Sequence, residues 1–158
     1  MKQQLALWAL VWIIGTACAP TTDTLSFEEF GIKPNTGEDA SVAATKLMNL
    51  LALREDSAHL TIVFPKGRYD FYPEEAFTKE YYISNHDQDN PKRVGIALEG
   101  VQNITIDGQG SEFIFHGRMI PFALLNTKNI VLKNFSVDFE VPAFRQLEIL
   151  TVDREADE

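Results

Sequence analysis

Two 14-residue stretches of this 158-residue chain follow a similar pattern and lie 26 residues apart. Residues 95–108 read G-I-A-L-E-G-V-Q-N-I-T-I-D-G, and residues 121–134 read P-F-A-L-L-N-T-K-N-I-V-L-K-N. The expected strands that follow, F-I-F at residues 113–115 and V-D-F at residues 137–139, match at an offset of 24, so the turn before the second of them is two residues shorter. A period of this length, with short strands and Gly/Asn turns, indicates stacked structural repeats.

The repeat predicts a mainly β fold, a right-handed parallel β-helix (solenoid) in which each coil turns once around an apolar interior. The inward side chains of one coil would stack on those of the next. The first set comprises Ile104, Ile106, Phe113 and Phe115, and the second comprises Ile130, Leu132, Val137 and Phe139. Asn103 would lie over Asn129 in a ladder of hydrogen-bonded amides. A β-sandwich is the alternative architecture, but its strands would not repeat at one fixed length.

One helix is expected before the repeats, over residues 39–53. Asp39 can cap this helix, and the apolar residues that follow have helical spacing. The helix would cover the open apolar end of the first coil and block its unpaired strand edges. Stacked repeats need about three or more coils and a cap at both ends. Because only two clear coils and one irregular coil precede Glu158, we expect a solenoid truncated at its C-terminal end, the front part of a longer protein.

The first residues have the features of an export signal. Lys2 supplies a positive charge, residues 5–14 form an unbroken apolar run, and residues 15–17 are small. An apolar run of about ten residues is too short to span a bilayer, which needs roughly twenty. We therefore predict that residues 1–17 are a signal peptide and that the protein is exported.

Cys18 follows the small residues directly, and this arrangement resembles the lipobox of bacterial lipoproteins. Gly15 departs from that pattern, because a leucine or similar apolar residue is usual three positions before the cysteine. The resemblance implies acylation of Cys18, residues 18–24 as a short tether, and a protein held in the bacterial cell envelope through its lipid alone. Ordinary cleavage near Ala17, with secretion and a free thiol, is the alternative.

Composition excludes several classes of protein. A single cysteine rules out a disulfide framework. The chain has 14 Lys and Arg against 23 Asp and Glu, a net charge of -9, which argues against nucleic-acid binding. The sequence has no metal-ligand cluster, phosphate-binding loop, dinucleotide fingerprint or serine-nucleophile elbow, so we expect neither a metal nor a cofactor.

Four residues are candidates for chemistry. Asp138 and Glu140 alternate with apolar residues, so both carboxylates would face outward on one strand, either as a catalytic pair or merely as a solvated face. His86 and Asp87 lie in a long polar insertion, and long loops on a rigid scaffold often bind ligands. A hydrogen bond between these two side chains that holds the loop together is the alternative.

Two further features are interpreted as structural. Residues 107–110, D-G-Q-G, are expected to form a turn in which the glycines adopt positive φ. His116 follows a strand, and we expect its side chain to be solvated or to pair within a turn.

Five segments together resemble those of a known family. They are residues 64–69 (F-P-K-G-R-Y), 81–88 (Y-Y-I-S-N-H-D-Q), 104–110 (I-T-I-D-G-Q-G), 113–119 (F-I-F-H-G-R-M) and 133–140 (K-N-F-S-V-D-F-E). Over roughly residues 25–152 the chain resembles glycoside hydrolase family 110, the bacterial exo-α-1,3-galactosidases. The I-D-G-x-G piece is common among β-helix proteins, whereas S-N-H-D-Q and F-I-F-H-G-R-M are much more specific.

The resemblance implies removal of terminal α-1,3-linked galactose from a glycan, with inversion at the anomeric carbon. Inversion uses two carboxyl groups roughly 6.5–9.5 Å apart. The resemblance places these acids in coils after Glu158, so residues 25–158 would be the N-terminal part of the catalytic domain and inactive alone. Another β-helix enzyme, of the polygalacturonase or pectate lyase type, and a non-catalytic glycan-binding surface protein remain alternatives.

Overall fold

A computed structural model describes residues 23–54, 58–82 and 90–141 of the chain. This part of the protein is mainly β, with one α-helix and one short 3-10 helix, η1. In chain order the elements are β1 (Asp23–Ser26), η1 (Phe27–Phe30), α1 (Ala40–Ala52), β2 (Leu60–Val63), β3 (Arg68–Phe71), β4 (Phe77–Lys79), β5 (Lys92–Glu99), β6 (Gln102–Phe115), β7 (Ile120–Leu125) and β8 (Lys128–Phe139).

The strands form two sheets that are built mainly from parallel pairs. In the first sheet, β6 pairs with β2 and β3 along one edge and with β8 along the other, and β1 extends the sheet from β2. In the second sheet, β5 pairs with β7 in parallel and with β4 antiparallel. β2–β3, β5–β6 and β7–β8 therefore form three successive layers. β1 pairs from Asp23 onward, so residues 23 and 24, expected in the tether, belong to the sheet.

The sequence repeat corresponds to the pairing register. Ile104 pairs with Ile130 at an offset of 26, and Phe113 pairs with Val137 at an offset of 24. The register changes between Asp107 and Ser111, where β6 has the two additional residues. The expected stacking of one repeat on the next is confirmed.

Asparagines mark the turns between the two sheets. Asn129 donates a hydrogen bond from Nδ2 to Oδ1 of Asn103 at 2.8 Å, which confirms the amide ladder. Both residues have positive φ, 57° for Asn103 and 54° for Asn129. Asparagine tolerates this left-handed conformation better than most residues because its short side chain bonds locally. The repeated asparagines therefore turn the chain and also join adjacent layers.

The apolar side chains between the two sheets form one continuous core. Buried aromatic rings run through it from layer to layer; for example, Phe113 lies 4.8 Å from Phe64 and 4.7 Å from Phe135, measured between ring centroids. Its largest fully buried members are Phe27, Leu47, Leu51, Ile62, Phe64, Tyr69, Phe71, Ile96, Leu98, Ile104, Phe113 and Phe115.

Burial of the second predicted inward set is only partial. Val137 occupies the expected register above Phe113 but is 42% exposed, which corrects its assignment as a buried residue. Phe135 is the aromatic residue of β8 that stacks on Phe113. Among the described residues, nothing pairs with the outer edge of β8, so its side chains are covered from one side only.

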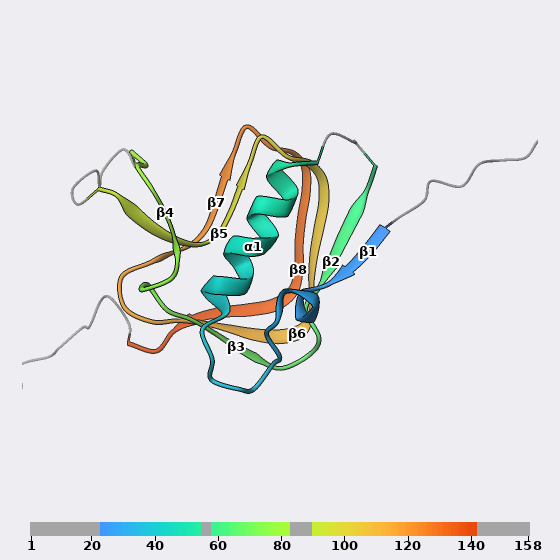
Figure 1. Cartoon of the computed structure of the whole chain (residues 1–158). Helices are drawn as coiled ribbons and strands as arrows, with labels where there is room; N and C mark the ends of the chain where they lie inside the picture. The colour runs from blue at the N-terminus through green and yellow to red at the C-terminus, as the bar shows by residue number, and fades with distance from the viewer. Residues whose placement is uncertain (1–22, 55–57, 83–89, 142–158) are drawn as a thin grey trace, which may run out of the picture.

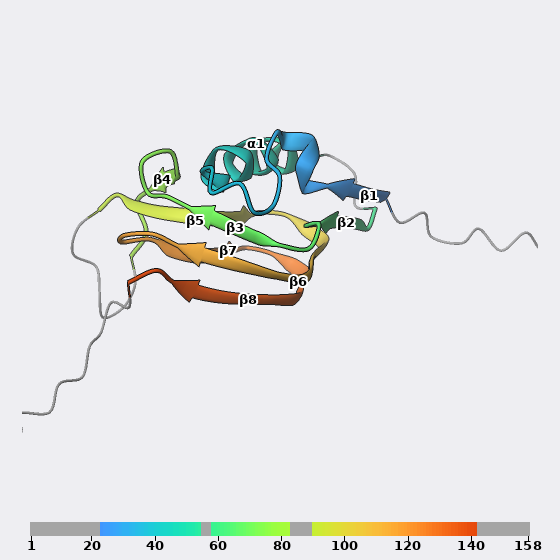
Figure 2. The ribbon, with the colours of Figure 1, turned by 90° about the horizontal axis from the view of Figure 1, so that it is seen from below.

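Helix α1 covers the other end of the layers. Oδ1 of Asp39 accepts hydrogen bonds from the amides of Ser41, at 2.8 Å, and Tyr72, at 3.0 Å. The first bond caps the helix, and the second fixes its start to the residue after β3. Figures 1 and 2 show α1 lying across the first layer, with β8 at the opposite end. The helix expected over residues 39–53, and its place over the first layer, are confirmed.

The glycine-rich segment of β6 differs from the expected turn. Gly110 has positive φ, 84°, but the other left-handed residue is Gln109, at 50°. Gly108 serves a different purpose: a Cβ atom there would lie 2.5 Å from Cβ of Phe135 and 2.8 Å from the carbonyl oxygen of Asn134. Glycine at 108 therefore permits close approach between layers rather than a left-handed turn.

Candidate functional site

Four ionisable side chains form a continuous stack across the three layers. Arg68 and Asp70 alternate on β3, His116 follows β6, and Glu140 follows β8. Nε of Arg68 donates to both carboxylate oxygens of Asp70 at 3.0 Å. Nε2 of His116 lies 2.8 Å from Oδ1 of Asp70, and Nδ1 lies 2.7 Å from Oε2 of Glu140. We call these four residues the ion stack.

Burial differs strongly along the ion stack. The side chain of Asp70 is 4% exposed and that of His116 is also buried, whereas that of Glu140 is 58% exposed. The ring of Tyr72 stacks on the His116 ring, with centroids 4.0 Å apart. The two middle members of the ion stack are therefore buried, whereas both ends, Arg68 and Glu140, reach the surface.

These contacts displace the ionisation equilibria of Asp70 and Tyr72, among others. Burial by itself raises the pKa of Asp70, but hydrogen bonds and charge from Arg68 and His116 outweigh it and hold the pKa below its ordinary value. The pKa of Tyr72 is raised, by loss of solvent and by the carboxylates of Asp70 and Glu140. Asp70 is consequently a fixed anion rather than a proton donor at neutral pH.

The structure describes both members of the predicted carboxylate pair, Asp138 and Glu140. Asp138 is exposed, and its Oδ1 accepts a hydrogen bond from the amide of Phe139 at 2.8 Å. Glu140 is also exposed, but it lies just beyond the end of β8 and one of its oxygens contacts His116. His116 itself is 7% exposed, so the expectation of a solvated side chain was wrong. Its two carboxylate neighbours explain how a polar ring is accommodated there.

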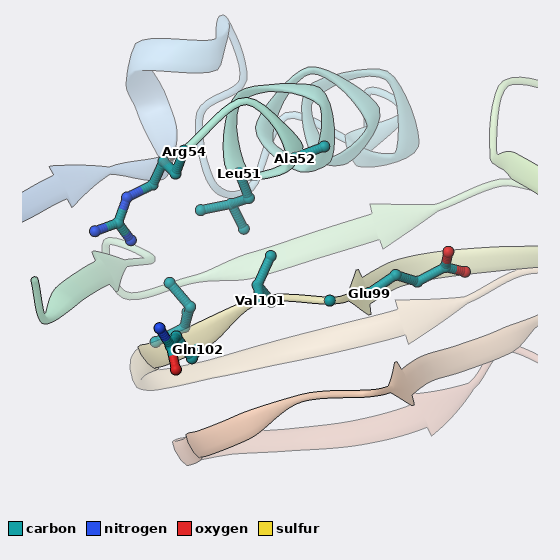
Figure 3. A pocket seen from close by; sticks show the side chains of 8 residues that line it. Leu51, Ala52, Arg54, Glu99, Val101 and Gln102 are labelled. Carbon is teal, nitrogen blue, oxygen red and sulfur yellow. The ribbon is translucent and has the colours of Figure 1, made fainter. Parts of the chain in front are cut away.

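A cavity of about 270 Å³ lies between the end of α1 and the turn that joins β5 to β6. Figure 3 shows that the charged ends of Arg54 and Glu99 point away from each other. Glu99 accepts hydrogen bonds from Lys79 and from the hydroxyl of Tyr81, and these two contacts lower the pKa of Glu99. Since the charged groups do not converge, the cavity does not have the form of a two-carboxylate active site.

The remaining candidates lie outside the described residues: His86 and Asp87 of the polar insertion, and Cys18. Among the residues that the structure does describe, no three His, Cys, Asp or Glu side chains are grouped to hold a metal ion. In the same part of the chain, no helix has the length and apolar character needed to cross a membrane.

Sequence reasoning missed Arg68, Asp70 and the role of His116. A signal is present, because Arg68, Asp70 and Tyr72 alternate with buried aromatic residues and so share the opposite face of β3. However, His116 lies 46 residues after Asp70, whereas the visible repeat is 26 residues long. A 26-residue repeat therefore could not predict that Asp70 and His116 lie side by side.

Comparison with curated proteins reveals relatives with the same name in several organisms. The chain is 52% identical over 128 residues to alpha-1,3-galactosidase B of Bacteroides fragilis, covering 80% of the chain and 22% of the relative. It is 44% identical over 150 residues to alpha-1,3-galactosidase B of Phocaeicola vulgatus, covering 94% of the chain and 25% of the relative. It is also 44% identical over 122 residues to alpha-1,3-galactosidase A of Shewanella woodyi, covering 77% and 19% respectively.

No model of a protein family matches the chain. The alignments extend over most of the chain but over a quarter or less of each relative. Identity of 44–52% over more than 120 residues agrees with the family resemblance of the motifs at residues 64–69 and 113–119. By its sequence, the chain belongs to glycoside hydrolase family 110.

Proposed function

We propose that this chain is part of a glycoside hydrolase that releases terminal α-1,3-linked galactose from glycans with inversion at the anomeric carbon. The observation that carries the proposal is the 41–52% identity to relatives named alpha-1,3-galactosidase B. The substrate would be a galactose-terminated glycan, and the reaction would need no cofactor.

We further propose that the layers are the first coils of a right-handed parallel β-helix, with α1 as its N-terminal cap. The parallel pairing of β5 with β7 and of β6 with β8 supports this architecture. So does the apolar surface at the β8 end, where Val131 is 45% and Val137 is 42% exposed, because a further coil would cover these side chains.

The catalytic carboxylates of the proposed enzyme are assigned to coils beyond the described residues. Inversion needs two carboxyl groups roughly 6.5–9.5 Å apart, one as acid and one as base. Asp70 is a poor choice for either role, because its carboxylate is buried and already bonded to Arg68 and His116. Asp138 and Glu140 remain candidates from their exposure on the outer surface.

The activity is tested with the protein expressed from the complete gene. Incubation with a Gal-α-1,3-Gal disaccharide should release galactose, and proton NMR of the first product should show the β-anomer, as inversion requires. A matched α-1,4-linked disaccharide serves as the control and should remain intact. Absence of galactose release from the α-1,3-linked substrate would refute the proposed activity, and an α-anomer as first product would refute inversion.

We also propose export, with residues 1–17 as the signal peptide and a lipid on Cys18 as the anchor. The sequence around Cys18 supports this proposal. Cells fed with labelled palmitate should incorporate label into the parent protein, whereas the Cys18→Ala variant should carry none. Equal labelling of the two proteins, or none in the parent, would contradict the anchor.

A further inference from the structure

Both nitrogens of the His116 ring face carboxylate oxygens. Nε2 lies 2.8 Å from Oδ1 of Asp70, and Nδ1 lies 2.7 Å from Oε2 of Glu140. Ionised carboxylate oxygens only accept hydrogen bonds. Both contacts are therefore hydrogen bonds only when both ring nitrogens carry a proton, which makes the ring an imidazolium.

The charges around the ring favour the same form. Arg68 and Asp70 approach from β3, Glu140 from the residue after β8, and the Tyr72 ring covers one face. Asp39, at the start of α1, accepts a hydrogen bond from the amide of Tyr72 and is a further ionisable group on this side. With an imidazolium, the ion stack alternates cation, anion, cation, anion and is neutral overall. A neutral ring would leave a nitrogen lone pair against a carboxylate oxygen.

The two carboxylates would respond differently to loss of the proton. Asp70 is 4% exposed, so water cannot replace a lost hydrogen bond without rearrangement, whereas Glu140 is 58% exposed and can turn to solvent. We propose that the buried His116 imidazolium joins the three layers as a clasp, and that loss of its proton releases Glu140 while Asp70 stays bonded. The clasp is a pH-sensitive device.

Release of Glu140 should affect the backbone beside it. The amide of Glu140 donates to the carbonyl oxygen of Phe115 at 3.1 Å, a bond between the second and third layers. This backbone hydrogen bond lies next to the side-chain contact between Glu140 and His116. Opening the clasp therefore weakens the layer contact at this point, and amide exchange at Glu140 reports it.

Hydrogen–deuterium exchange of the intact protein tests the clasp. Exchange in the peptide that contains the Glu140 amide is followed from about pH 6 to about pH 9, a range on both sides of the ordinary imidazole titration. After correction for the intrinsic pH dependence of exchange, we expect protection in the parent to fall roughly tenfold across this range. The Glu140→Gln variant, which lacks the charge, should show low protection at every pH.

A matched control separates the clasp from general loosening of the layers. Nζ of Lys133 lies 3.2 Å from Oδ2 of Asp107, an ion pair that also joins β6 to β8 but contains no imidazole. The Lys133→Gln variant should keep the pH dependence of the parent at Glu140. Constant protection in the parent from about pH 6 to about pH 9, or an unchanged pH dependence in Glu140→Gln, would overturn the proposal.

Discussion

Replacement of Phe113 by alanine is expected to lower the free energy of unfolding by about 4 kcal/mol. Phe113 is fully buried in the second layer, and its ring packs against Phe64 and Phe71 from the first layer and Phe135 from the third. Removing the ring leaves a cavity that neighbours fixed in paired strands cannot fill. Pulse proteolysis of the intact protein in a urea series measures the change.

Val137→Ala is the matched control for Phe113→Ala. Val137 pairs with Phe113 in register, but it is 42% exposed, so its truncation should cost less than about 1 kcal/mol. Equal losses for the two variants would show that the apolar interior does not run between the sheets as described. A loss below about 1 kcal/mol for Phe113→Ala would have the same meaning.

Asp70→Asn is expected to lower the free energy of unfolding at neutral pH by about 3 kcal/mol. The carboxylate is 4% exposed and bonds to Arg68 and to the ring of His116. An amide of the same shape leaves these two groups without their shared anion, and removing one member of a buried ion pair is far more costly than removing an exposed one. Urea unfolding of parent and variant at neutral pH gives the difference.

The effect of Asp70→Asn should depend on pH in a defined direction. The pKa of Asp70 is lowered in the folded protein, so its stabilisation is complete above the ordinary aspartate pKa, roughly 3.9, and disappears as the pH falls through the folded value. The difference in unfolding free energy between parent and variant should therefore shrink as the pH falls below about 4.

Asp138→Asn is the control for Asp70→Asn. Asp138 is exposed and bonds only to its neighbour's amide among the contacts described, so its replacement should change the unfolding free energy by less than about 0.5 kcal/mol. If the difference between parent and Asp70→Asn stayed the same below about pH 4, the ion stack would not hold Asp70 as an anion.

Much of the layered arrangement could be predicted from the sequence. The 26-residue offset specifies which residue lies over which, because strand side chains alternate with a period of two and a shift of one would expose the apolar set. Ile104 over Ile130 and Asn103 over Asn129 follow directly. Helical spacing after a capping Asp39 predicted α1, because both signals are local.

The ion stack could not be predicted in this way. Asp70 and His116 are 46 residues apart, and β4 and the segment after it lie between them, so no repeat marks the pair. The role of Gly108 was also hidden, since only the position of Phe135 in the next layer shows why a Cβ atom does not fit. Burial of Val137 depends on whether another layer follows. The alternation of apolar residues within one strand does not show whether such a layer is present.

The sequence by itself determined the period, the register within the repeated part and the capping helix, because each depends on residues close together or on a regular spacing. Tertiary structure alone decided which charged side chains meet across layers and which end of the core stays uncovered. The physical reason is that a buried charge is tolerated only beside its counter-charges, and in this protein those counter-charges come from layers that the chain reaches at irregular intervals.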